Sequence, residues 1–214
     1  MNESTEAGAA RLGLRPPTRP AWQGPPDVLR LVWTRPRATV RWILDHGGMR
    51  LSILLVCGAA AAAVVADSAL FERTAEFGRW TWLVELSVGI LLGITAWVLA
   101  AAALTWLGRI LGGVGTWREL LVAVAWGQAP AAAGLPFALL KMWSHSLDTA
   151  DSEFLSDLCL FALWIWALIT TTLAVAEAHR FALGRAVLCV LAAAGLYVAL
   201  GAVLHALFGL DLGL

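Results

Sequence analysis

Few side chains in this sequence combine a reactive type with the spacing that chemistry requires. Glu177 and His179 are two residues apart, and side chains two apart on a helix do not face each other, so we expect no shared metal ion. Cys57, Cys159 and Cys189 lie inside apolar runs without the spacing of a zinc or redox site. Gly-x-Ser-x-Gly and His-Glu-x-x-His motifs are absent. We therefore expect no catalytic residue, no metal, no cofactor and no enzymatic activity.

The segment Gln128-Ala129-Pro130 interrupts an apolar run and is the first candidate site. Pro130 lacks the amide proton that would bond residue 126, so it should kink a helix. Carbonyls freed at membrane depth need partners, and Gln128 could supply one. Broken helices also form the binding sites of transporters, so a small transporter or channel is the alternative function. No second half of the sequence mirrors this break, which favours a packing kink.

Two acids near the ends of apolar runs are further candidates. Thr116 and Glu119 have the spacing of a capping box, which predicts a structural role for Glu119 at a helix start. Glu177 lies close to the hydrocarbon, where an unpaired acid is costly. We expect an Arg to pair with Glu177, and Arg118 and Arg180 are the first candidates. The rival interpretation makes Glu177 a functional acid exposed to a water-filled opening.

The composition places these residues in a membrane protein. The chain has 214 residues, of which 60% are hydrophobic and 14% charged, with 15 basic and 15 acidic side chains and a mean hydropathy of +0.76. Soluble domains are about half apolar and about a quarter charged. The composition argues against a disordered chain, a disulfide scaffold and a nucleic-acid binder, so we expect no nucleic-acid partner.

Five apolar stretches are long enough to cross a bilayer, which takes about 20 residues of helix. Their backbone groups must be satisfied within each segment, so each is predicted to be a helix. We expect an all-α membrane protein with a bundle of five transmembrane helices in residues 49–214. The predicted spans are Leu51–Leu70, Leu86–Leu107, Leu120–Leu140, Leu158–Ala176 and Ala186–Phe208.

The basic residues divide unevenly between the two sets of connections. One side carries 12 Arg and the other only Arg73, Arg79 and Lys141. Basic residues favour the cytoplasmic side, so we expect a cytoplasmic N-terminus and a C-terminus outside after five crossings. The Arg-rich segments are residues 1–50, 108–119 and 177–185.

The N-terminal region divides into two parts before the first span. Residues 1–26 are polar and rich in Pro, which predicts a disordered tail. Residues 27–48 predict an interfacial amphipathic segment in which Asp27 caps a short helix, Pro36 starts a second one and Gly47 and Gly48 end it.

The side chains of the second short helix predict how it meets the membrane. Arg37 and Arg41 share one face, because they are four residues apart. Val40 and Ile43 lie largely away from that face. We expect a lipid-facing elbow with Arg toward phosphate; a binding surface for a cytoplasmic partner is the alternative.

Small residues four apart occur in the first and fifth spans, as Gly58 with Ala62 and Gly195 with Ala199. Such pairs let helices approach closely. Packing within the bundle and homo-oligomer formation are both consistent with them, as is contact with another membrane protein.

Several motifs together resemble the Yip domain, the Ypt-interacting family of five-pass membrane proteins, and its bacterial branch. They are Trp-Thr-Arg-Pro-Arg-Ala-Thr at 33–39, Leu-Gly-Gly-Val-Gly-Thr-Trp at 111–117, Gln-Ala-Pro at 128–130 and Ala-Glu-Ala-His-Arg-Phe-Ala-Leu-Gly-Arg-Ala at 176–186. The resemblance implies an integral protein of the bacterial inner membrane and implies no reaction. We expect a non-enzymatic protein that organises or binds protein partners or membrane lipids.

Overall fold

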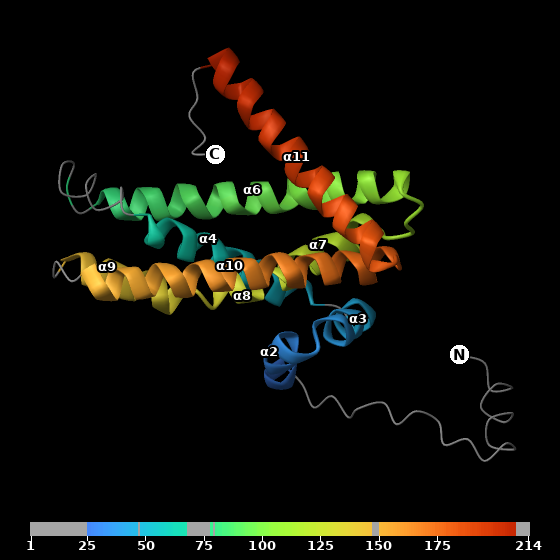
Figure 1. Cartoon of the computed structure of the whole chain (residues 1–214), viewed down its shortest axis with the longest axis horizontal. Helices are drawn as coiled ribbons and strands as arrows, with labels where there is room; N and C mark the ends of the chain where they lie inside the picture. Colours follow the sequence, from blue (N-terminus) through green and yellow to red (C-terminus); the bar gives the residue numbers. More distant parts are fainter. Residues whose placement is uncertain (1–24, 47, 68–77, 79, 147–149, 209–214) are drawn as a thin grey trace, which may run out of the picture.

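Helices form almost all of the described structure, a computed structural model of the chain (Figure 1). It describes residues 25–46, 48–67, 78, 80–146 and 150–208. The helices in this part are α2 (Pro25–Thr34), α3 (Pro36–His46), α4 (Met49–Ala66), α6 (Thr81–Ile110), α7 (Trp117–Gly127), α8 (Ala129–Ala132), α9 (Leu135–Ser146), α10 (Ala150–His179) and α11 (Leu183–Phe208). The predicted tail at residues 1–26 lies outside the described residues except for Pro25 and Pro26.

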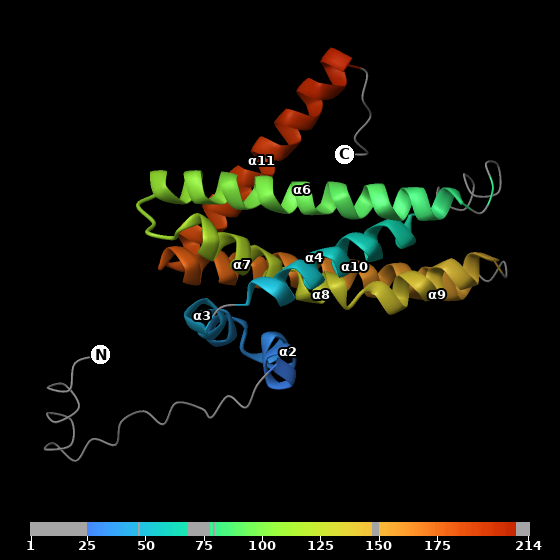
Figure 2. The same cartoon turned by 180° about the vertical axis from the view of Figure 1, so that it is seen from behind.

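The membrane-spanning helices confirm the predicted fold class. Helices α4, α6, α10 and α11 are each long and apolar enough to cross a bilayer by themselves. A fifth span is formed if α7 and the α8–α9 segment, which are bent by 41° at the break, count as one. In Figures 1 and 2 the α7–α9 chain runs along α10 in the opposite direction over most of its length. We therefore describe α7, α8 and α9 as one broken span.

The core lies where α4, α7 and α10 meet. Helix α7 is buried from Leu120 to Gly127 with the single exception of the half-buried Leu121. Trp126 and Leu120 are among the largest fully buried side chains. Helix α10 contributes Ala174 and Val175 to the same cluster. Helices α4, α6, α10 and α3 all pack against α7.

Helices α2 and α3 pack on the bundle, which corrects the expectation of a lipid-facing elbow. The chain restarts at Pro36 as predicted, and α3 ends at His46 just before the two glycines. Val40 and Ile43, which were expected to face the acyl boundary, are buried, and α3 packs against α10 and α7. Helix α2 begins at Pro25, so Asp27 lies in its first turn instead of capping it. We call α2 and α3 together, residues 25–46, the α2–α3 platform.

Helix α11 leaves the bundle at an angle (Figures 1 and 2). It packs on α10 and α6, and from Ala194 to Leu200 every residue is exposed. A side chain at Gly195 would meet no atom within 4 Å, whereas one at Gly58 would meet Ala132 at 3.4 Å. The glycine of the first small pair therefore serves packing inside the bundle, and that of the second is left open.

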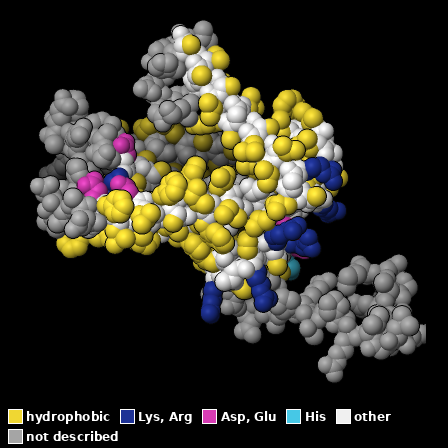
Figure 3. All heavy atoms as spheres, viewed as in Figure 1, with side chains coloured by type: hydrophobic (Ala, Val, Ile, Leu, Met, Phe, Trp, Pro, Cys, Tyr) yellow, Lys and Arg dark blue, Asp and Glu magenta, His cyan; other side chains and the backbone are white. Residues whose placement is uncertain are grey.

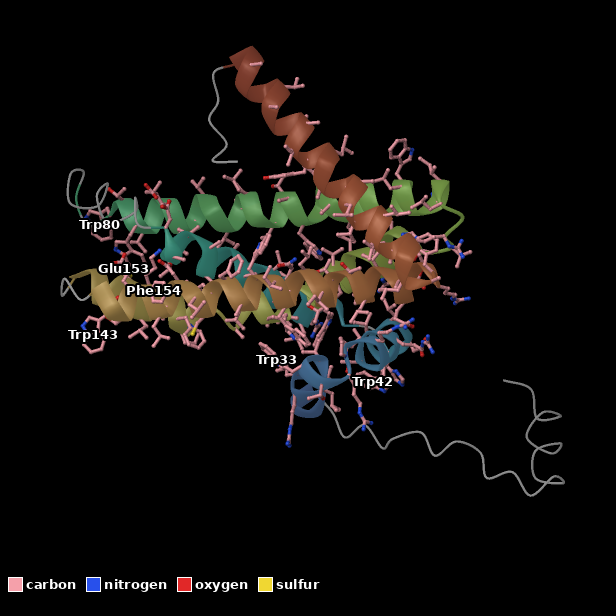
Figure 4. All side chains as sticks on the ribbon, in the orientation of Figure 1. Trp33, Trp42, Trp80, Trp143, Glu153 and Phe154 are labelled. Carbon is pink, nitrogen blue, oxygen red and sulfur yellow. The ribbon has the colours of Figure 1, made fainter. Side chains whose placement is uncertain are left out.

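Charge separates along the bundle. Figure 3 shows most Lys and Arg of the visible face toward one end and on the lobe below the bundle, and most Asp and Glu at the opposite end. We call the end with connections 110–117 and 180–182 the arginine end, and the opposite end, which carries Asp67, Glu85 and Asp157, the acidic end. Figure 4 places Trp80, Trp143 and Glu153 together at the acidic end. Nine Arg on the α2–α3 platform, at the start of α4 and around the arginine end are all exposed: Arg30, Arg35, Arg37, Arg41, Arg50, Arg109, Arg118, Arg180 and Arg185.

Candidate functional site

A two-arginine clamp on Glu177 holds the α2–α3 platform against α10. The Nε of Arg37 donates to Oε1 of Glu177 at 2.6 Å, and the Nε of Arg41 donates to Oε2 at 2.9 Å. A second nitrogen of Arg41 also bonds Oε2, so Arg41 binds through two donors. The Glu177 side chain is only 4% exposed, whereas the Arg37 and Arg41 side chains are 52% and 71% exposed.

The partners of Glu177 differ from those proposed from the sequence. Arg118 and Arg180 were the first candidates, but both are exposed, and the Glu177 carboxylate is bound by Arg37 and Arg41 instead. Arg180 instead occupies the turn after α10 with a φ of 57°. The spacing of Arg37 and Arg41 was a usable signal, because two cations on one helical face suit a single carboxylate.

Local chemistry of α3 sets the position of the clamp. Pro36 provides a fixed φ at the first helical position, and the hydroxyl of Thr39 donates to the carbonyl of Arg35 at 2.9 Å. Thr39 is fully buried, so the face between the two arginines turns toward the bundle. The helix thus presents apolar side chains to α10 and α7 and brings both guanidinium groups to one buried carboxylate.

A second cluster surrounds His179, two residues beyond Glu177, and sequence reasoning missed it. The Gly115 N–H donates to Nδ1 at 3.2 Å, and Nε2 lies 3.1 Å from the carbonyl of Leu104. This geometry assigns the ring proton to Nε2 and makes His179 a neutral connector of α6, α10 and the 110–117 connection. The ring also stacks on Phe181 with centroids 5.0 Å apart.

Three glycines leave the space that the His179 ring fills. A Cβ at Gly108 would overlap the ring, and one at Gly113 or Gly115 would lie 2.5 or 2.8 Å from Nδ1. We call Gly108, Gly113 and Gly115 the glycine cradle. The cradle thus packs the glycine-rich connection against the His of the Ala-Glu-Ala-His-Arg-Phe run. In the sequence, the cradle could have been suspected only from closely spaced glycines and a His within an apolar context.

Glu119 has the structural role that its spacing predicts. It receives a hydrogen bond from the Thr116 N–H at 2.7 Å, and its own N–H donates to the Thr116 hydroxyl at 3.3 Å. Both halves of the capping box are therefore formed at the start of α7. The neighbouring Arg118 is exposed to solvent.

Helix α10 packs against the break at Gln128 and Pro130. Pro130 leaves the carbonyl of residue 126 without its helical donor, and at the next residue the Gly127 carbonyl accepts from the Thr170 hydroxyl at 2.7 Å. Gln128 was expected to supply a partner to the freed carbonyl. Gln128 instead directs its amide to the hydroxyl of Thr171 at 3.4 Å. Pro130 is buried, and a side chain at Gly127 would collide with Thr171. Close packing of α7 on α10 accounts for this arrangement.

The described residues offer surfaces for binding more clearly than groups for chemistry. No cluster of three or more His, Cys, Asp or Glu suited to a metal ion occurs within the ranges that the structure describes. The clamp and the cradle both use their polar atoms internally. What remains available at the arginine end is a set of exposed guanidinium groups beside a helical pair of fixed position.

Fold and site together define a multi-pass α-helical membrane protein with a docked N-terminal helical pair. Residues 30–204 match the Yip1 domain, which covers more than half of the chain, and the protein belongs to the Yip1 domain family. The match includes the second half of α2, the clamp, the cradle and the broken span. No curated protein matches the chain, and no solved structure matches it.

Proposed function

We propose that this protein is a non-enzymatic organiser of the bacterial inner membrane that binds anionic lipid headgroups through its α2–α3 platform. The observation that carries the proposal is the docked position of this platform. Val28 and Val32 are buried, while Arg30 and Arg35 are exposed on the same helical pair. Leu29 and Trp33 are also exposed beside them.

The exposed side chains of the platform suit the boundary between headgroups and acyl chains. Leu29 and Trp33 can bury apolar surface there while the guanidinium groups remain at the level of phosphate. Each basic residue near an anionic membrane surface contributes about 1 kcal/mol of attraction. Arg37 and Arg41 share a single carboxylate, so the clamp itself retains a net positive charge. The platform therefore favours phosphate-bearing lipids of negative charge.

The proposal places the arginine end in the cytoplasm. Basic connections are retained on the cytoplasmic side, and four exposed Arg lie in or beside the connections at this end: Arg109, Arg118, Arg180 and Arg185. An alkaline-phosphatase reporter joined at Gly113 should be inactive, and one joined after Leu214 should be active. An active reporter at Gly113 would show that the orientation is the opposite of the one proposed. An inactive reporter after Leu214 would show that the fifth crossing is absent.

The lipid preference can be measured on the purified full chain. Lipid that binds the native state raises its stability, so phosphatidylglycerol should raise the melting temperature in neutral detergent more than phosphatidylcholine does. Arg30→Gln with Arg35→Gln should abolish this difference. The matched control, Arg109→Gln with Arg118→Gln, removes the same charge from the arginine end and leaves the platform unchanged. It should retain most of the difference in melting temperature between the two lipids. Equal responses to both lipids, or an undiminished response in the platform variant, would contradict the proposal.

A further inference from the structure

An apolar cavity lies beside the broken span, away from the arginine end. Its volume is about 290 Å³, it is lined by α4, the α8–α9 segment and α10, and it is open on one side. Four Ala of α4 form one wall. They are three and four residues apart and therefore share a helical face. The lining is Ala59, Ala62, Ala63, Ala66, Ala131, Gly134, Leu160, Phe161, Leu163 and Trp164.

The cavity follows from the break and from the small residues around it. The 41° bend between α7 and the α8–α9 segment carries the chain away from a straight path. Alanines and one glycine then leave the resulting space unfilled. A wall with no atoms opposite it loses its dispersion contacts. Water is a poor occupant, because it needs two or more polar partners and every lining side chain is apolar.

Aromatic residues at the edge of the cavity indicate an opening toward lipid. Phe161 and Trp164 line the cavity and are at the same time among the exposed large hydrophobic residues. Their rings stack with centroids 6.4 Å apart. Side chains that belong to both the lining and the outer surface mark a lateral mouth, and a hydrocarbon chain in the bilayer can enter there.

A charged pair lies between the cavity and the acidic end. Lys141 Nζ is 2.8 Å from Asp157 Oδ1, with side chains 16% and 53% exposed. Lys141 is seven residues beyond Gly134 along the chain, and Asp157 is four residues before Phe161. At about 1.5 Å per helical residue, these separations place the pair one to two turns from the lining. Lys141 is thus a cation above an apolar cavity, at the distance of a headgroup from the first part of an acyl chain.

We infer that the cavity binds one acyl chain of a glycerophospholipid whose phosphate is held by Lys141. An ammonium donates readily to phosphate, while the surrounding apolar wall excludes water from the chain. The occupant belongs to the leaflet at the acidic end. This site is separate from the lipid-binding surface of the α2–α3 platform, and neither requires the other.

Native mass spectrometry of the purified full chain tests the inference, with retained phospholipid as the readout. Ala131→Leu and Ala63→Leu add side chains to the cavity and should abolish retention of one phospholipid. Both variants should keep or raise thermal stability in lipid-free detergent, because they fill a void. Ala192→Leu on the exposed side of α11 adds the same atoms elsewhere and should leave retention unchanged.

Two substitutions in the charged pair test whether Lys141 binds the phosphate of the headgroup. Lys141→Gln should lower phospholipid retention about tenfold, as expected for one charge-assisted hydrogen bond. Asp157→Asn breaks the same ion pair but keeps the cation, and should leave retention equal or higher. The inference would be overturned if both filled variants still retained a phospholipid, or if only detergent were found bound to the native chain. It would also be overturned if Lys141→Gln and Asp157→Asn lowered phospholipid retention equally.

Discussion

Replacing both arginines of the clamp should destabilise the protein more than replacing Glu177, although the same hydrogen bonds are lost. Arg37→Gln with Arg41→Gln leaves a carboxylate that is 4% exposed without its cations, a change that costs about 3–5 kcal/mol. Glu177→Gln leaves two guanidinium groups that are 52% and 71% exposed, and water can solvate them. Its cost should be about 1–2 kcal/mol, which is the range for lost hydrogen bonds.

The triple variant separates this explanation from simple loss of packing. Adding Glu177→Gln to the double arginine variant removes the orphan charge, so stability should recover toward that of Glu177→Gln alone. The stability of all three variants is compared by melting temperature in one detergent. Arg30→Gln with Arg35→Gln, elsewhere on the α2–α3 platform, is the charge-matched control. A triple variant less stable than the double variant would show that the carboxylate is not the source of the loss.

The second large effect is expected at the glycine cradle. Gly108→Ala places a methyl group against the His179 ring. The ring is held by the Gly115 N–H, by Leu104 and by Phe181, so it has no free direction in which to move. Overpacking of this kind costs about 1–3 kcal/mol, and occasionally more. We expect a clear fall in melting temperature and in the yield of monodisperse protein.

Two variants make the cradle prediction specific. His179→Ala should cost stability in the native background but much less in the Gly108→Ala background, because the collision is then absent. Gly195→Ala is the matched control, since its new methyl group meets no atom within 4 Å. Alanine in a helix interior is favoured over glycine by about 0.5–1 kcal/mol, so this control should be neutral or stabilising. Equal losses at Gly108 and Gly195 would contradict a role for the ring.

Features set by local sequence were predictable. The apolar segments were found because the length of an apolar run determines whether a helix can cross a bilayer. The capping box at Thr116 and Glu119 was found because its two partners are three residues apart. The start of α3 at Pro36 and its end at His46 agree with the prediction made from the proline and the glycines that follow. Each of these signals is complete within a few consecutive residues.

Features that join distant segments were not predictable in the same way. Glu177 and Arg37 are separated by 140 positions, and nothing in a local pattern distinguishes Arg37 from Arg118 or Arg180 as a partner. The apolar face of α3 was read as lipid-facing, since periodicity marks an apolar face without saying whether lipid or protein covers it. The hydroxyl that satisfies the Gly127 carbonyl likewise comes from 43 positions away.

The separation between the clamp residues also fixes an order of assembly during synthesis. Arg37 and Arg41 leave the ribosome 140 and 136 residues before the carboxylate that binds them. At about 5–20 residues per second, several seconds pass before that carboxylate exists. Throughout this interval the buried faces of α2 and α3 have no docking surface on α10, and the nascent chain must keep them from aggregating. Completion of the fourth crossing is therefore the event that first allows the N-terminal helices to reach their final position.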